Sequence, residues 1–193
     1  MQIELTFEGE VFRKVDTTIF GKKPKVASHA TTIEEYQEAF NKVELVKARQ
    51  YAIKRLSLMN LSSKALSSSL RRCLVSEETT ERIIDEFISL GYLNDKEWIR
   101  GFARQKLSAK YGLRKVLQAL SQKGFEKQEI VSAIEGMEDL CEPENEKQAI
   151  LKLLKTRFRT RDLSIYKEKQ KVIASLLRRG FDFALIIDVI KLT

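Results

Sequence analysis

The stretch VLQALSQKGF, residues 116–125, decides the fold because its spacing returns twice elsewhere in the chain. Residues 172–181 read VIASLLRRGF and residues 66–75 read LSSSLRRCLV, so each copy has an apolar residue at its first, fifth and tenth positions. Positions four apart lie on one stripe of a helix. Gly124 and Gly180 stand where the end of a helix needs a left-handed residue, and the first copy lacks this glycine. The sequence therefore predicts a helical unit repeated three times.

Repeated units of this size predict an array. One short unit cannot bury its apolar face alone, so neighbouring units stack and together offer a long binding surface. We expect a mainly α fold of three tandem three-helix modules that form an elongated, curved array. Residues 2–7 alternate in polarity and residues 11–20 are rich in β-branched side chains, which predicts a small N-terminal β-hairpin. The expected domains are the hairpin and a linker (1–31), a first module with an N-terminal helical extension (32–95), a second module (96–141) and a third module (142–193).

Capping residues predict where the helices begin. Serine, threonine, asparagine and aspartate at a helix start accept hydrogen bonds from first-turn amides. The expected caps are Thr31 or Thr32, Ser62 or Ser63, Ser76, and Asn94 or Asp95. In the helix that follows Asp95, Trp98, Phe102 and Leu107 are expected to face inward, and the basic residues outward. The last helix of the second module is predicted over 126–137, and those of the third over 144–158, 164–179 and 182–190.

The net charge of +8 is concentrated near the C-terminus. Residues 146–193 contain 12 Lys/Arg and 5 Asp/Glu, whereas residues 1–45 contain 6 Lys/Arg and 8 Asp/Glu. Such asymmetry predicts a polyanionic partner that is contacted chiefly by one end of the chain. Nucleic acid is the first candidate, and an acidic protein groove is the second.

The sequence favours a binding protein over an enzyme. It has neither a GxxxxGK[ST] phosphate loop nor a GxSxG elbow, and His29 has no histidine or cysteine cluster near it. Cys73 and Cys141 lack metal-ligand spacing and are expected to be thiols of a reducing cytosol. No signal peptide or apolar run long enough to span a membrane is recognised. We expect a soluble, cytoplasmic, monomeric protein with no cofactor.

Two groups of basic residues are the candidate binding sites. In the second module, Arg100 and Arg104 are one helical turn apart, which predicts a shared exposed stripe for protein contact. The full group there is Arg100, Arg104, Lys106, Lys110, Arg114 and Lys115. The group in the third module, predicted to bind DNA or an acidic groove, is Lys155, Arg157, Arg159, Arg161, Lys167, Lys169, Lys171, Arg178 and Arg179. Phe181 is in the core register of the repeat, so base stacking on it is not expected.

Several motifs resemble one family. Residues 91–95 read GYLND, an aromatic-led helix with Phe102 and Arg104 follows, and then come Gly112 and the repeat that ends in Lys123-Gly124-Phe125. The echo LLRRGF at 176–181 completes a pattern that resembles the RecX family of recombination regulators over residues 46–193. The resemblance implies structural roles for Gly91, Tyr92, Asn94, Asp95, Gly112, Gly124 and Gly180.

The resemblance also implies a function. Members of the family bind the RecA recombinase and its filament on single-stranded DNA, and so restrain strand exchange and co-protease activity in DNA repair and the SOS response. Some also bind single-stranded or double-stranded DNA directly. The alternative from the residues alone is a general helical nucleic-acid-binding protein without a recombinase partner, because short three-helix units also resemble helix-turn-helix modules.

Overall fold

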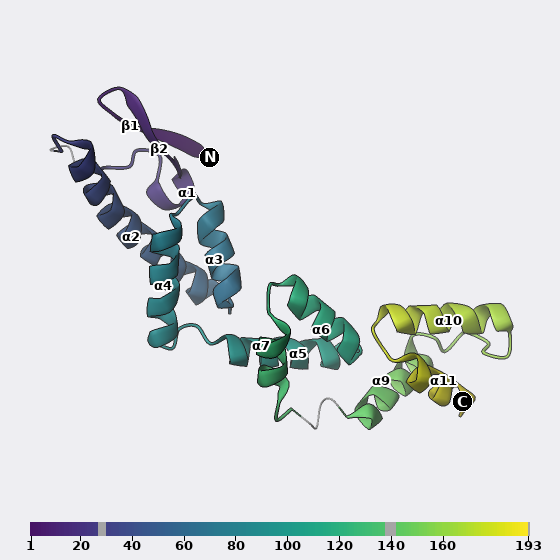
Figure 1. The fold of residues 1–193 in the computed structure, drawn as a ribbon. Coiled ribbons are helices and arrows are strands. Elements are labelled where there is room, and N and C mark those ends of the chain that lie inside the picture. The colour runs from purple at the N-terminus through teal and green to yellow at the C-terminus, as the bar shows by residue number, and fades with distance from the viewer. Residues whose placement is uncertain (27–29, 138–141, 193) are drawn as a thin grey trace. The chain divides into compact units, whose positions relative to one another are not determined.

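The computed structural model describes residues 1–26, 30–137 and 142–192, and it divides into two compact units, 1–95 and 96–193. It is mainly helical, with repeated three-helix modules and one two-stranded antiparallel sheet near the N-terminus, which confirms the predicted fold class (Figure 1). His29 and Cys141 lie outside the described residues. Within those residues, none of the helices combines the length and apolar character that a membrane span requires.

The first unit begins with a β-hairpin that is shorter than predicted. Strands β1 (Gln2–Phe7) and β2 (Glu10–Asp16) pair antiparallel, with an irregularity between Leu5 and Thr6. The prediction that the second strand extends to residue 20 was wrong, because Thr17–Phe20 forms the short helix α1. The carboxylate of Asp16 accepts a hydrogen bond from the Thr18 amide at 2.8 Å, which starts a helical turn in place of further strand.

The first module consists of α2 (Ile33–Leu58), α3 (Ser63–Arg72) and α4 (Glu77–Ser89). Its predicted caps are confirmed, since the hydroxyls of Thr32, Ser62 and Ser76 each accept an amide hydrogen bond from three residues further on. Of the alternatives that the sequence left open, the structure selects Thr32 and Ser62. Satisfied first-turn amides explain why the three helices begin where they do.

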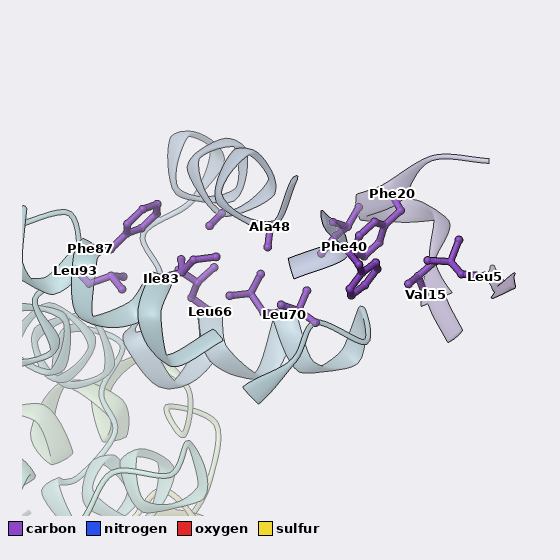
Figure 2. Close-up of a cluster of buried hydrophobic side chains, with 13 residues drawn as sticks. Leu5, Val15, Phe20, Phe40, Ala48, Leu66, Leu70, Ile83, Phe87 and Leu93 are labelled. Carbon is purple, nitrogen blue, oxygen red and sulfur yellow. The ribbon is translucent and has the colours of Figure 1, made fainter. Parts of the chain in front are cut away.

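The hairpin and the first module share one apolar core. Figure 2 shows Leu5, Val15 and Phe20 from the N-terminal elements in line with Phe40 and the side chains of α2–α4. Phe20 stacks on Phe40 with ring centroids 5.7 Å apart. The remaining buried members are Ile19, Ala48, Ala52, Leu66, Leu70, Val75, Ile83, Phe87 and Leu93. Because this core is continuous, burial of apolar area fixes the hairpin against the helices.

A buried carboxylate links the same elements. Glu44 on α2 is fully buried, and it accepts hydrogen bonds from the Ser76 amide at 3.2 Å, the Ser76 hydroxyl and the Thr79 hydroxyl at 2.8 Å. The Arg13 guanidinium of β2 lies 3.5 Å from Oε1 of Glu44, the oxygen that also accepts from the Ser76 amide, and it lies over the Phe40 ring. The negative charge is therefore held at the positive start of α4 and paired with the hairpin.

The second unit contains two more modules, each with its own apolar cluster. The second module consists of α5 (Asp95–Ser108), α6 (Leu113–Gln122) and α7 (Lys127–Ile134). The third consists of α9 (Pro143–Thr156), α10 (Tyr166–Arg178) and α11 (Phe183–Lys191), close to the predicted ranges. The clusters centre on Val116, Leu120 and Phe125 and on Val172, Leu176 and Phe181, which confirms the core positions read from the repeat.

Two details of the second module differ from the prediction. Helix α7 ends at Ile134, before the predicted residue 137, because Gly136 has φ +86° and turns the chain. On α5, Trp98, Phe102 and Leu107 do pack against the cluster, but they are only partly buried, whereas Ile99 and Ala103 are fully buried. The large rings therefore border the core, where Trp98 stacks on Phe102 and Phe125 at centroid distances of 5.3 and 5.6 Å.

All three copies of the repeat end their helix with the same turn. The amides of Val75, Phe125 and Phe181 donate to the carbonyls five residues earlier at 3.2, 3.3 and 3.4 Å. The residue before each of these is left-handed, with φ of +61° at Leu74, +91° at Gly124 and +87° at Gly180. This is the Schellman arrangement that closes a helix, and the first copy forms it without glycine.

Candidate protein and nucleic-acid interface

The GYLND motif shapes the join between α4 and α5. Gly91 takes a φ of +74°, and the Tyr92 amide donates to the Phe87 carbonyl at 2.8 Å, so the glycine ends α4 as predicted. Asn94 directly precedes α5, and Asp95 is the first residue of that helix. The Asp95 carboxylate accepts hydrogen bonds from the Ser63 amide at 2.7 Å and from the Ser63 hydroxyl, and it thereby caps α3. Within this motif, Gly91 thus ends α4 and Asp95 holds the start of α3.

A second acidic residue does the same for the next module. Glu146, in the first turn of α9, accepts the amide hydrogen bond of Leu113 at 2.6 Å and caps α6. Both caps thus come from the first helix of the following module, and both place a negative charge at the positive end of a helix. Neither capping role was predicted from the sequence. A signal exists in the nearly equal separations of 32 residues for Ser63 and Asp95 and 33 for Leu113 and Glu146.

Gly112 and Gly180 bring the backbones of the second and third modules into contact. The Gly112 amide donates to the Arg179 carbonyl at 2.9 Å. A Cβ on Gly112 would lie 2.3 Å from the Gly180 oxygen, and one on Gly180 would lie 2.4 Å from the Lys115 amide nitrogen. At Gly124, by contrast, a Cβ would meet nothing within 4 Å. Two of the motif glycines therefore serve close packing as well as, at Gly180, a left-handed turn.

Arg100 and Arg104 differ in their surroundings. The guanidinium of Arg100 donates to the Ala133 carbonyl at 2.8 Å and to Glu97 at 2.7 Å, so its side chain caps the C-terminal end of α7. Arg104, one turn further along α5, is exposed. Of the two arginines in the predicted exposed stripe, Arg100 therefore bonds within the module and Arg104 faces solvent.

The remaining lysines of α5 border aromatic rings. The Lys106 ammonium lies 5.4 Å from the Phe102 ring centre and 5.5 Å from that of Tyr111. Lys110 adopts a left-handed φ of +62° in the turn that ends α5. Lys110 also lines an open hollow of about 600 Å³ that extends to Lys152 and Lys155 on α9. Lys152, one turn from Lys155, was not among the predicted site residues.

Three cations of the third module are already engaged. Arg161 and Lys171 both pair with Glu168, and the Lys171 ammonium lies 3.0 Å from its carboxylate. Their hydrogen bonds, that of Lys171 first, hold the pKa of Glu168 below its ordinary value of 4.5, so the carboxylate stays ionised at neutral pH. The Arg179 guanidinium lies 5.3 Å from the Tyr111 ring centre and donates to the Lys110 carbonyl at 3.2 Å. The structure thus gives these predicted site residues intramolecular contacts.

The other predicted cations lie at the surface. Lys169 is partly buried, and Lys155, Arg157, Arg159, Lys167 and Arg178 are exposed, as are the paired Arg161 and Lys171. Phe181 is buried in the core as predicted, which removes it as a stacking surface.

Arg178 shares a hollow with two cations of the second module. Arg114 and Lys115, in the first turn of α6, line an open space of about 600 Å³ together with Leu177 and Arg178 at the end of α10. Its other lining residues are Gln118, Gly180 and Phe181. We call this space the junction hollow. The sequence had assigned its cations to separate surfaces, and only the fold brings them together.

These features define a helical-repeat protein with a basic surface. Comparison with known proteins then identifies the proteins to which it is similar. The family model for the third three-helix domain of RecX matches residues 144–190. The chain is 31% identical over 134 residues to the regulatory protein RecX of Neisseria meningitidis serogroup C, covering 69% of this chain and 82% of that protein. It is 29% identical over 161 residues to the regulatory protein RecX of Clostridium botulinum strain Alaska E43, covering 82% and 74%.

Solved structures agree on the fold. A crystal structure of a regulatory protein RecX matches 97% of this chain and 93% of its own with a TM-score of 0.65 at 18% identity. The structure of RecX from Lactobacillus salivarius matches 77% of this chain and 95% of its own with a TM-score of 0.64 at 22% identity. The chain belongs to the RecX family of regulatory proteins.

Proposed function

We propose that this protein regulates homologous recombination and DNA repair without catalysing a reaction, by binding the RecA recombinase and its filament on single-stranded DNA. Binding restrains strand exchange and co-protease activity. Membership of the RecX family, whose relatives are named regulatory proteins, is the observation that carries the proposal. The repeated modules and the excess of positive charge near the C-terminus support it, since a long polyanionic assembly is a suitable partner for both.

In this proposal the second and third modules bind different parts of the filament. The second module contributes recombinase contacts through the exposed members of its predicted basic group, Arg104 and Arg114, with Arg104 foremost. The third module, with its exposed Lys155, Arg157, Arg159 and Lys167, holds phosphate or an acidic protein surface. Occupation of the filament groove then blocks entry of the duplex or weakens subunit packing. The protein acts as a cytoplasmic monomer and needs no cofactor.

The first experiment measures RecA ATP turnover and strand exchange on single-stranded DNA with a several-fold excess of this protein. Regulation predicts a clear drop in strand exchange. Unchanged turnover and strand exchange at that excess would defeat the proposal.

Charge reversal then tests the second module. Arg104→Glu is the suitable variant, because Arg100→Glu would also remove the cap of α7. The matched control is Lys127→Glu, which makes the same charge change at an exposed position at the start of α7. We expect Arg104→Glu to weaken filament regulation and Lys127→Glu to leave it unchanged.

A second candidate, a general nucleic-acid-binding helical protein, is favoured by the same exposed cations. Binding to single-stranded DNA with and without recombinase and a nonhydrolysable nucleotide, over a salt series, separates the two. Tighter binding to the preformed filament, persisting at salt that removes bare DNA, supports the regulator. Equal affinity with one steep salt dependence supports the second candidate.

A further inference from the structure

The junction hollow collects positive charge from two helices. Arg114 and Lys115 extend from the first turn of α6, and Arg178 comes from the last turn of α10. Cations in the first turn of a helix are electrostatically unfavourable, because the unpaired amides there already carry partial positive charge. Gln118, one turn along, accepts a hydrogen bond from the Lys115 ammonium at 3.1 Å. The arrangement therefore concentrates positive potential in one place.

The lining of the junction hollow contains no carboxylate among the residues that the structure describes. By contrast, Arg100 is paired with Glu97 and Arg161 with Glu168 elsewhere in the second unit. Glu146 also reaches the start of α6, but it caps the Leu113 amide and lines the hollow beside α9 instead. The charge of the junction hollow is thus left for a ligand to neutralise.

Close backbone packing fixes these cations in place. Gly180 lies against the backbone of Lys115, where a Cβ would come within 2.4 Å of its amide nitrogen. This contact holds the end of α10 beside the first turn of α6. The fold therefore sets the backbone positions of the three cations, and a ligand has to order only their side chains.

We propose that the junction hollow binds the phosphodiester backbone of single-stranded nucleic acid. The forked guanidinium groups of Arg114 and Arg178 match phosphate oxygens in pairs, and Lys115 adds a point charge. Leu177, 40% exposed at the hollow, offers apolar surface to the sugar or base. The net charge of +7 over residues 146–193 suits a strand with one charge per nucleotide better than a protein surface of mixed charge. The choice of single-stranded DNA as ligand rests on the proposed function.

The test uses the full chain and a fluorescent oligothymidine, with anisotropy measured between about 50 and 200 mM salt. The test variant is Arg114→Gln with Arg178→Gln, two exposed side chains. The control is Lys96→Gln with Lys127→Gln, which removes the same charge from exposed positions of the second unit outside the hollow. Circular dichroism verifies that both variants fold.

We expect the hollow variant to lose about tenfold or more in affinity and the salt slope to fall by roughly 1.4, since each phosphate contact on a single strand contributes about 0.7. The control should stay within about twofold of the wild type, because distant exposed charges are screened. An equal loss in both variants, or no loss in the hollow variant, overturns the proposal.

Parallel assays with recombinase keep the two proposals separable. If the hollow variant binds oligothymidine normally but loses filament binding, the ligand is an acidic protein surface and the phosphate proposal is overturned. If oligothymidine binding depends on the hollow while the wild type leaves RecA turnover unchanged, the hollow is supported and the proposed regulator function is not.

Discussion

The two units end their repeated helices with the same turn but fasten their helices by different chemistry. In the first unit, a buried carboxylate on Glu44 joins α2, the start of α4 and the hairpin. In the second unit, close backbone contacts at Gly112 and Gly180 join the second and third modules, and the Glu146 carboxylate and the Arg179 guanidinium add hydrogen bonds to backbone groups of the second module. The two joins also differ at the surface. The first pairs Arg13 with the buried carboxylate, whereas Arg114 and Arg178 beside the second join are exposed.

The same helical repeat therefore occurs in two settings, one in which charge stabilises the fold and one in which charge lies at the surface. A buried ion pair is stable only while both partners are present, so the Arg13 and Glu44 charges of the first unit serve to hold the fold together. The contacts at Gly112 and Gly180 do not involve the side chains of Arg114, Lys115 and Arg178, which line the junction hollow. Variants that remove one of these contacts at a time test whether the two units are held together in different ways.

The largest expected effect is at Glu44. Glu44→Ala leaves Arg13 and the start of α4 without their buried partner, and we expect the free energy of unfolding of the first unit to fall by about 3–5 kcal/mol. Urea denaturation followed by circular dichroism measures the loss. Trp98, the single tryptophan, lies in the second unit, so its fluorescence transition should stay in place.

Glu38→Ala is the matched control on the same helix, because Glu38 is exposed. Its effect should stay within about 0.5 kcal/mol. A similar small change in both variants would show that the buried carboxylate does not fasten the first unit.

The next effect compares two glycines at the same repeat position. Gly124→Ala places a Cβ in open space and should lose only about 1–2 kcal/mol for the left-handed backbone. Gly180→Ala adds a clash with Lys115 and should lose roughly 1–3 kcal/mol more. Trp98 fluorescence during urea denaturation reads both variants. Equal losses would contradict the close contact at Gly180.

A smaller effect separates the two arginines of α5. Arg100→Ala removes charged hydrogen bonds to the end of α7 and should lose about 1.5–3 kcal/mol of stability. Arg104→Ala, at an exposed site, should change stability by less than about 0.5 kcal/mol. Thermal unfolding compares the two, and a reversed order would mean that the cap of α7 contributes nothing.

The smallest effect concerns Glu168, which neutralises Arg161 and Lys171. Glu168→Gln should release both cations and strengthen binding to single-stranded DNA by a few fold, with a steeper salt slope. Because the pKa of Glu168 is lowered, its ion pairs persist at neutral pH and are lost as the pH falls through that lowered value. The affinity of the wild type for single-stranded DNA should therefore not change between about pH 6 and 8. If Glu168→Gln binds single-stranded DNA no more tightly than the wild type, the two cations are not released by the substitution.

Much of the fold could be predicted from the sequence because the relevant signals are local. The spacing of Val116, Leu120 and Phe125 marks one helix face, and Ser62 and Ser76 cap the helices that follow them. The hairpin was harder, since the β-branched residues 17–19 and Phe20 favour strand by propensity, whereas the Asp16 cap starts a helical turn. Leu74 was also hard to predict, because it takes a left-handed φ of +61° in a turn where the other two copies have glycine.

The candidate site was less predictable because the sequence shows charge but not what each charge contacts. Arg100 and Arg179 belong to the predicted basic groups, yet their guanidinium groups bond to carbonyls. Arg178 stands beside Arg179 in the chain and instead faces the junction hollow. Neighbours in sequence diverge in this way because successive side chains on a helix point in different directions.

The sequence by itself determined the repeated helical units, their caps and the concentration of positive charge near the C-terminus, because these follow from local spacing and composition. Only the tertiary structure decided which charges are paired and which face a hollow. Glu44 meets Ser76 across 32 residues, and the Arg179 side chain reaches Lys110 across 69. Contacts at such separations depend on how helices pack, and packing is set by the shapes and burial of many side chains together.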